Sequence, residues 1–214
     1  MCDRVNFDYF DKVLERVKVD SCVLEVGSYD VNGNCKSCVL EKGMEYLGVD
    51  IRHGPGVDVV CDMGLGEEVS RCFGNKKFDL IVCMNVLEHV FEPIRLLDNL
   101  VSLLADDGYL VIVVPSVWDL HDYPADYYRL NPDFFSKYGA LSQLDIVGDL
   151  FSFSVRNTRK FYQDVSVLPM VMPDIYRNRF VLFCVKVFSL FWPEIRQVWP
   201  YTYLNVTYRS NRKG

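Results

Sequence analysis

The residues best suited to chemistry lie in the segment 118–135, which reads WDLHDYPADYYRLNPDFF. His121 is followed directly by Asp122, and Asp126 lies four residues further on. The unperturbed pKa of imidazole lies near neutral pH, so a histidine oriented by a carboxylate can take a proton from a hydroxyl group. His121 and Asp122 are therefore candidate catalytic residues, with His121 as the base and Asp122 or Asp126 as the orienting acid. The alternative is that these aromatic and charged side chains only fix the segment to the fold.

A second group of polar residues follows short apolar runs. The stretch VLEVGSYDVNG, residues 23–33, has Glu25 two positions before Gly27, whose missing side chain lets a ligand approach the backbone. The run YLGVD ends in Asp50, about twenty residues further on, where an acid can accept hydrogen bonds from ribose hydroxyls. These positions favour a nucleotide site.

Two later runs end in the same way. VVCDM ends in Asp62 and Met63, and FDLIVCMNVLEHV has Asn85 at the tip of its apolar stretch. His89, in the same motif, has three open interpretations: an acid or base, a metal ligand together with Glu88, or a residue at the start of a helix. We favour a structural or pocket-wall role for His89 and assign no metal site.

These residues need a scaffold that brings their strand ends together. Apolar residues at helical spacing predict helices over 6–18 and 94–104, the second ending before Asp106-Asp107-Gly108. Near-continuous apolar strands that alternate with helices predict a parallel sheet covered on both faces, a doubly wound α/β fold. In such a sheet, ligands bind outside the carboxyl ends of the strands, where the strand order reverses. The expected strands are 22–26, 46–50, 57–61, 78–83 and 109–114.

The pattern changes after Pro115. A further helix is expected to begin at 131–133, and further strands are expected at 143–151 and 203–209. We divide the chain into a cofactor-binding core over 1–151 and a basic, aromatic-rich extension over 152–214 that completes the sheet and packs on the core.

Four motifs in register resemble one known family. VLEVGSYDVNG, YLGVDIRHGPGVDVVCDM, FDLIVCMNVLEHV and LLADDGYLVIVVP, in this order and spacing, are similar to the class I S-adenosylmethionine-dependent methyltransferases of the small type with a V-L-E-H-V signature. The resemblance covers roughly residues 20 to 150. It implies a Rossmann-like methyltransferase fold, with a mostly parallel seven-stranded sheet and helices on both faces, and S-adenosyl-L-methionine as the cofactor.

The resemblance also implies roles for the residues at the strand ends. Glu25 and Gly27 would lie against the methionine moiety and its amino group, and Asp50 would hold the ribose. Asp62 and Met63 would frame the adenine. Asn85 would face the sulfonium side.

The glycine loop departs from the family pattern. The family commonly has a second glycine two positions after Gly27, where this chain has Tyr29, and Gly33 comes late. The loop must therefore take another course. Nicotinamide binding is the rival interpretation, but it requires G-x-G-x-x-G, which GSYDVNG does not supply.

Charge is divided unevenly along the chain. Residues 1–155 carry 13 Lys and Arg against 26 Asp and Glu, whereas residues 156–214 carry 10 against 3. Neither part has the signature of a nucleic-acid-binding module, so no nucleic-acid partner is expected. The eight cysteines and the absence of a secretory leader favour a reduced, cytoplasmic setting. Cys35 and Cys38 form a lone C-x-x-C without a second pair, which favours packed thiols over a metal site.

The run FVLFCVKVFSLFW, residues 180–192, is apolar on nearly every side of a helix and too short to span a bilayer. It is either a buried helix, a homodimer contact or a weakly membrane-binding interfacial helix. We favour burial or dimerisation.

The sequence therefore predicts an enzyme, a methyltransferase acting on an oxygen of a small-molecule or glycan acceptor. The rival hypothesis is a non-catalytic module that keeps the cofactor fold and binds a protein partner or a membrane surface through residues 152–214.

Overall fold

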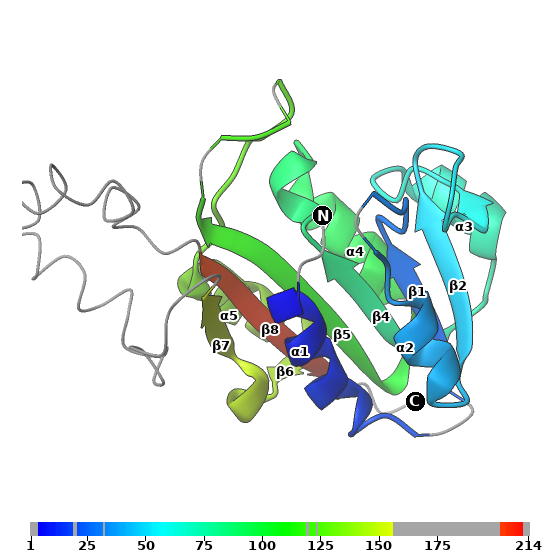
Figure 1. Ribbon diagram of the computed structural model, residues 1–214, viewed down its shortest axis with the longest axis horizontal. Coiled ribbons are helices and arrows are strands. Elements are labelled where there is room, and N and C mark those ends of the chain that lie inside the picture. The colour runs from blue at the N-terminus through cyan, green and yellow to red at the C-terminus, as the bar shows by residue number, and fades with distance from the viewer. Residues whose placement is uncertain are drawn as a thin grey trace, which may run out of the picture.

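A computed structural model describes residues 4–18, 21–31, 33–118, 120–122, 124–155 and 202–211. These residues build one eight-stranded sheet with the order β3-β2-β1-β4-β5-β8-β6, and β7 pairs with β8 beside this path. Helices lie in front of the sheet and behind it (Figure 1). The doubly wound α/β fold predicted from the sequence is confirmed.

The parallel half of the sheet carries the predicted site. It consists of β1 (Cys22–Val26), β2 (Glu45–Asp50), β3 (Val59–Val60), β4 (Phe78–Met84) and β5 (Leu104–Val117). The strand order runs outward in one direction from β1 and in the other from β4. The carboxyl ends of β1 and β4 therefore flank the point at which the order reverses, where ligands bind in this kind of sheet.

The antiparallel half is built around β8 (Thr202–Ser210), which pairs with β5 on one side. On its other side β8 pairs first with β6 (Leu144–Ile146) and then with β7 (Ser152–Val155). The expected strand over 143–151 is thus interrupted by a short 3-10 helix, η2 (Gly148–Leu150). This interruption is the reason that the sheet has eight strands instead of the expected seven.

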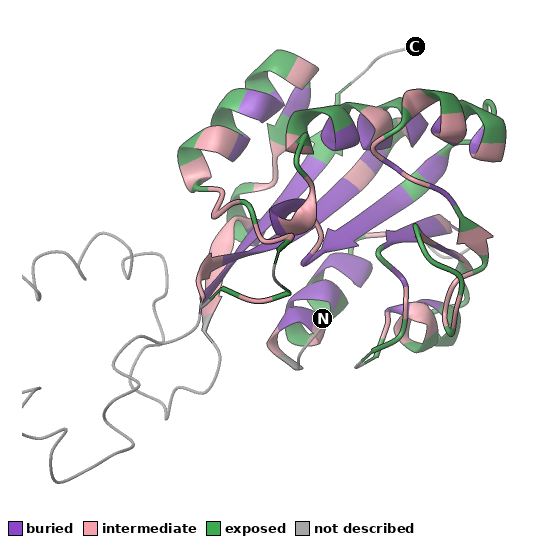
Figure 2. Cartoon of the chain, turned by 90° about the horizontal axis from the view of Figure 1, so that it is seen from above, coloured by how far each residue is buried: buried purple, intermediate pink, exposed green. Residues whose placement is uncertain are grey.

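Side chains on alternate strand positions form two buried clusters, one on each face of the sheet. One cluster includes Phe10 and Val39, from α1 (Arg4–Leu14) and α2 (Lys36–Glu41). The other packs against α3 (Gly66–Phe73), α4 (Pro93–Leu103) and α5 (Pro132–Ser142). Figure 2 shows the buried strands between these two helical layers. The mostly apolar strands are explained by this double coverage.

The junction between α4 and β5 differs from its sequence prediction. The helix ends at Leu103, and β5 already begins at Leu104, before the Asp106-Asp107-Gly108 signal. The pairing with β4 shifts register between Phe78 and Leu80, and Asp107 has a φ of 61°. The acidic signal therefore forms an irregularity inside the strand and does not cap the helix.

In the part of the chain that the structure describes, no helix has the length and apolarity that crossing a membrane requires. The predicted helix over 180–192 lies outside the described residues.

Candidate functional site

The loop after β1 is held tightly against the loop after β4. Gly27 has a φ of +80°, and a Cβ atom at this position would lie 2.4 Å from Cγ2 of Val86. The amides of Gly27 and Ser28 both donate to the carbonyl of Val49, at 2.9 and 3.1 Å. Only glycine combines this conformation with so close an approach. The Ser28 hydroxyl is buried, and among the described residues it has no hydrogen-bond partner.

Asp50 lies where the sequence predicted it, at the carboxyl end of β2 beside the β1 loop. Its side chain is 10% exposed. One carboxylate oxygen accepts from the Tyr29 amide at 3.3 Å, and the other accepts from the Arg52 amide at 3.0 Å. The carboxylate therefore has a fixed orientation and keeps lone pairs for further donors.

The structure accounts for the departure of the glycine loop from the family pattern. A Cβ atom on Gly54 would lie 2.2 Å from the ring of Tyr29, so the ring packs directly on the backbone of the loop after β2. The Arg52 guanidinium lies 5.0 Å from the centre of the same ring. Tyr29 thus replaces the second glycine by using space that Gly54 leaves, and it ties the β1 loop to the β2 loop.

Glu25 connects three elements of the sheet and its covering helices. One of its carboxylate oxygens accepts from the Cys35 amide at 2.9 Å and from the Tyr46 hydroxyl at 2.6 Å. Burial raises the pKa of Glu25 above its usual value, and these two hydrogen bonds oppose the rise. Its side chain contacts β2 and the start of α2, so it positions the loop that ends at Cys35.

Asp62 and Met63 follow β3, beside Asp50. The Cys61 amide donates to the Asp50 carbonyl at 3.0 Å, which brings the two strand ends together. One Asp62 oxygen accepts from the Gly64 amide at 2.8 Å. Met63 is buried, and its carbonyl accepts from the Asn99 side chain at 2.8 Å.

Asn85 closes the set at the end of β4. It has a φ of 55°, and its amide donates to the Val113 carbonyl at 2.8 Å. Its neighbour Val86 is the residue that contacts Gly27. The carboxyl ends of β1, β2, β3 and β4 therefore bring together the six residues proposed to bind the cofactor, although Glu25 is turned towards α2.

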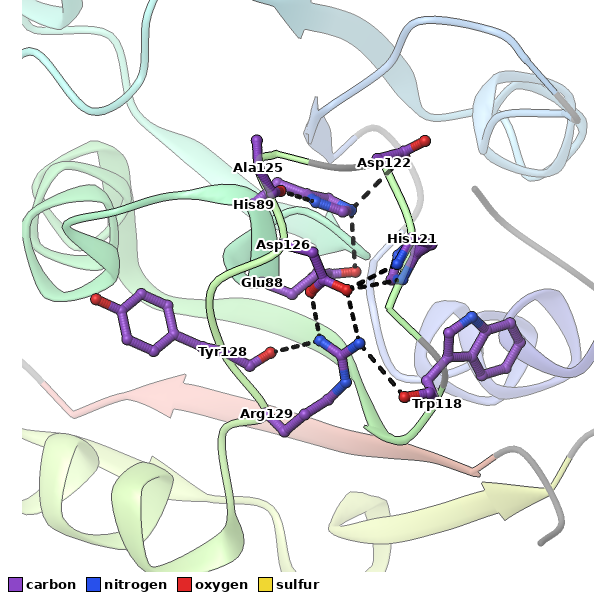
Figure 3. Close-up of polar contacts among 9 residues, drawn as sticks. All are labelled: Glu88, His89, Trp118, His121, Asp122, Ala125, Asp126, Tyr128 and Arg129. Atoms are coloured by element: carbon purple, nitrogen blue, oxygen red, sulfur yellow. Dashed lines mark hydrogen bonds and ion pairs between the residues drawn. The ribbon is translucent and has the colours of Figure 1, made fainter.

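The segment after β5 folds into a polar cluster (Figure 3). Nδ1 of His121 lies 3.2 Å from Oδ2 of Asp126, and the His121 amide donates to the same oxygen at 3.0 Å. The Arg129 guanidinium donates hydrogen bonds to both Asp126 oxygens, with Nη2 2.8 Å from Oδ2. These contacts with Arg129 hold the pKa of Asp126 well below its usual range. Asp126 is therefore a carboxylate that fixes the His121 ring.

Asp122 lies elsewhere than expected for an orienting acid. It has a φ of 52°, and its side chain is 75% exposed. Its Oδ2 lies 3.9 Å from Nε2 of His89 and not against His121. The turn at Asp122 directs its carboxylate to His89. Asp126 is therefore the acid that contacts His121.

His89 belongs to the same cluster. Its Nδ1 lies 2.5 Å from the Ala125 carbonyl, which accepts only, so this nitrogen carries the proton. Its ring meets the His121 ring edge to face, with 4.8 Å between the ring centres. Burial lowers the pKa of His89. The neutral ring therefore has its lone pair on Nε2.

Glu88 is a functional candidate that the sequence named only as a companion of His89. It lies in the 3-10 helix η1 (Leu87–His89), and only 1% of its side chain is exposed. Neither carboxylate oxygen makes a hydrogen bond within the described parts of the chain. Its Oε1 lies 3.7 Å from Nε2 of His89, and burial raises the pKa of Glu88 to about 8. A charged residue inside the apolar run from Val86 to Val90 was the available sequence signal.

The doubly wound fold, with polar loops at one edge of its sheet, is the architecture of the class I methyltransferases. The chain belongs to the family described as "Methyltransferase domain", whose model matches residues 3–143. None of the curated proteins compared with the chain matches it in sequence.

Solved structures share this fold. Phosphoethanolamine N-methyltransferase 2 of Haemonchus contortus, in complex with S-adenosyl-L-methionine, is 14% identical with a TM-score of 0.56; the match covers 96% of this chain and 53% of that one. The chain thus spans about half the length of that enzyme.

Two further methyltransferases have similar solved structures. The 1,6-didemethyltoxoflavin-N1-methyltransferase of Burkholderia thailandensis, with bound 1,6-didemethyltoxoflavin and S-adenosylhomocysteine, is 15% identical, with 94% and 76% coverage and a TM-score of 0.58. The CurJ carbon methyltransferase is 15% identical, with 98% and 56% coverage and a TM-score of 0.58. The neighbours thus include enzymes that methylate nitrogen and carbon.

Proposed function

We propose that this chain transfers the methyl group of S-adenosyl-L-methionine to a hydroxyl oxygen of a small or sugar-linked acceptor. The observation that carries the choice of oxygen is the His121–Asp126 pair, with 3.2 Å between Nδ1 and Oδ2, in the segment that follows β5. A hydroxyl is a weak nucleophile until it loses its proton, and an oriented imidazole that can accept this proton fits a hydroxyl acceptor.

The residues at the ends of β1 and β2 fit the methyl donor. Asp50 is a fixed and nearly buried carboxylate suited to ribose hydroxyls, and Gly27 lets the β1 loop pack closely against Val86 after β4. The buried Ser28 hydroxyl has no partner within the described residues and supports the same conclusion, since buried polar groups are normally hydrogen-bonded. Asp62 and Met63 would frame the adenine, and Asn85 would face the sulfonium side.

In the proposed reaction, the chain mainly positions the acceptor and excludes water. Asp126 holds Nδ1 of His121, so the lone pair of the neutral ring lies on Nε2 and can accept the hydroxyl proton. The new bond forms between the acceptor oxygen and the methyl carbon, and the electron pair of the broken carbon–sulfur bond remains on sulfur. S-adenosyl-L-methionine supplies the electrophilic methyl group.

Membership of the methyltransferase family supports an enzyme over the rival non-catalytic module. The test is to incubate the full chain with the methyl donor and a panel of small alcohols, phenols, free sugars and glycans, and to measure S-adenosylhomocysteine. A matched panel of amines serves as the comparison. Formation of a methyl ether from a hydroxyl acceptor would support the proposal, whereas turnover of the amines alone would refute oxygen as the acceptor atom.

A further inference from the structure

Glu88, His89 and His121 form a cluster of three potential metal ligands. One potential ligand atom from each of these three side chains lies within 4.8 Å of the other two. The residues come from two segments, η1 after β4 and the loop after β5, which the Tyr127 amide joins by donating to the Glu88 carbonyl at 2.8 Å. Figure 3 shows Glu88 and the two histidines gathered beside Asp126 and Arg129.

Glu88 gives the second and independent observation. A buried carboxyl group without a hydrogen bond is costly, because nothing replaces the water that it loses. Oε1 of Glu88 lies 3.7 Å from Nε2 of His89. Neither oxygen of the buried Glu88 carboxyl group makes a hydrogen bond to a described residue. A buried polar group that stays without a hydrogen bond indicates a missing partner, such as a bound ion.

The two histidines have the outer contacts that metal-binding histidines have. A ligating imidazole usually donates its other N–H to a carboxylate or a backbone carbonyl, which fixes its tautomer and orientation. His89 meets the Ala125 carbonyl through Nδ1, and His121 meets Asp126 through Nδ1. An imidazole that donates from Nδ1 in this way presents Nε2 to a metal ion.

We propose that Glu88, His89 and His121 bind a divalent transition-metal ion, with zinc as the best match to two imidazoles and one carboxylate. Donor atoms around zinc lie roughly 3.3 Å apart, because each bond to the ion is about 2.0–2.2 Å long. The distance of 3.7 Å between Glu88 and His89 and the limit of 4.8 Å for the whole set need only small side-chain rotations.

The ion would have an open position for the acceptor, which is typical of catalytic zinc sites. Its catalytic role rests on the proposed function: the ion would make the bound hydroxyl more acidic, and the exposed Asp122 carboxylate near His89 would take the proton. His121 would then be a ligand, which excludes the base role that the proposed function gives it, so turnover of the metal-free chain decides between the two roles. Binding of the ion itself needs neither the methyl donor nor the acceptor.

The test is to titrate the metal-free full chain with Zn²⁺ in a calorimeter and to record the visible spectrum with Co²⁺. We expect one ion per chain, and a loss of affinity of at least about tenfold in Glu88→Gln and in His89→Ala. The third histidine, His53, is exposed and outside the cluster, so His53→Ala is the matched control and should bind normally.

Two controls keep the result specific. Replacing Cys35 and Cys38 by serine separates this site from thiol binding, which Co²⁺ would reveal by an intense sulfur charge-transfer band. Melting curves and binding of S-adenosylhomocysteine establish that each variant is folded. Absence of binding, or binding that Glu88→Gln and His89→Ala leave unchanged in folded protein, would overturn the site. Turnover that survives complete removal of the ion would overturn its catalytic role while leaving the proposed methyl transfer intact.

Discussion

Replacing Asp50 by alanine tests whether the end of β2 binds the ribose of the methyl donor. The carboxylate is 10% exposed, and two backbone amides already fix its orientation. A ribose hydroxyl would therefore meet a charged acceptor that needs no reorganisation. A hydrogen bond to a charged group contributes about 1.5–3 kcal/mol, and every 1.4 kcal/mol changes affinity about tenfold. We expect S-adenosylhomocysteine to bind about ten- to a hundredfold more weakly.

The loop itself contributes to this effect, because Asp50→Ala also removes the contacts with the amides of Tyr29 and Arg52. Asp79 provides the matched control: its carboxylate accepts from the Cys22 amide at 2.8 Å, near the amino ends of β1 and β4. Asp79→Ala should lower the melting temperature and leave the affinity unchanged. A comparison of the two variants separates loss of ribose binding from loss of a backbone hydrogen bond.

Isothermal titration calorimetry at a temperature where each variant is folded gives the affinities directly. Equal affinity of Asp50→Ala and the parent chain would refute the ribose role. An equal loss in Asp50→Ala and Asp79→Ala would show that general stability, and not a contact with the ligand, controls binding.

Three other substitutions test separate parts of the argument. With an acceptor in hand and the chain kept free of metal, His121→Ala should reduce turnover by about 10²–10⁴-fold with nearly unchanged donor affinity. A small loss, or a larger specific loss in folded metal-free His89→Ala, would contradict the role of His121 as the base. Gly27→Ala should weaken donor binding and lower the melting temperature, because a positive φ costs a non-glycine residue about 1–2 kcal/mol and the new Cβ meets Val86; normal binding would mean that the loop adapts. Tyr208→Phe should cost about 0.5–1.5 kcal/mol in the free energy of unfolding, measured by urea denaturation, because it removes the 2.6 Å hydrogen bond to the Phe135 carbonyl; unchanged stability would rule that contribution out.

The parallel strands could be predicted from the sequence because they are buried on both faces. β1 over Cys22–Val26 matches its expected range, and β4 over Phe78–Met84 extends the expected range by one residue. The division of the expected strand 143–151 could not be predicted in the same way. The Val147 amide donates to the Thr207 carbonyl at 2.8 Å, so the local structure depends on a strand sixty residues further along the chain.

The positions of the site residues could be predicted better than their partners. A strand end fixes where Asp50 or Asn85 emerges, but it does not determine which acid meets His121. Sequence distance favours Asp122, which is adjacent to His121. The turn at Asp122 directs that side chain to His89, and the Arg129 guanidinium three residues after Asp126 holds Asp126 against His121. The pairing is therefore decided by the course of the loop.

Tyr29 shows the same dependence for the cofactor loop. By motif, a tyrosine at the position of the second glycine argues against the family, because glycine there normally makes room for a ligand. In the fold, Gly54 on the neighbouring loop makes room for the ring of Tyr29, and the Arg52 guanidinium lies 5.0 Å from the centre of that ring. The Tyr29 amide still donates to the Asp50 carboxylate. The space that the loop needs is thus a property of two loops together, and a motif confined to one of them cannot record it.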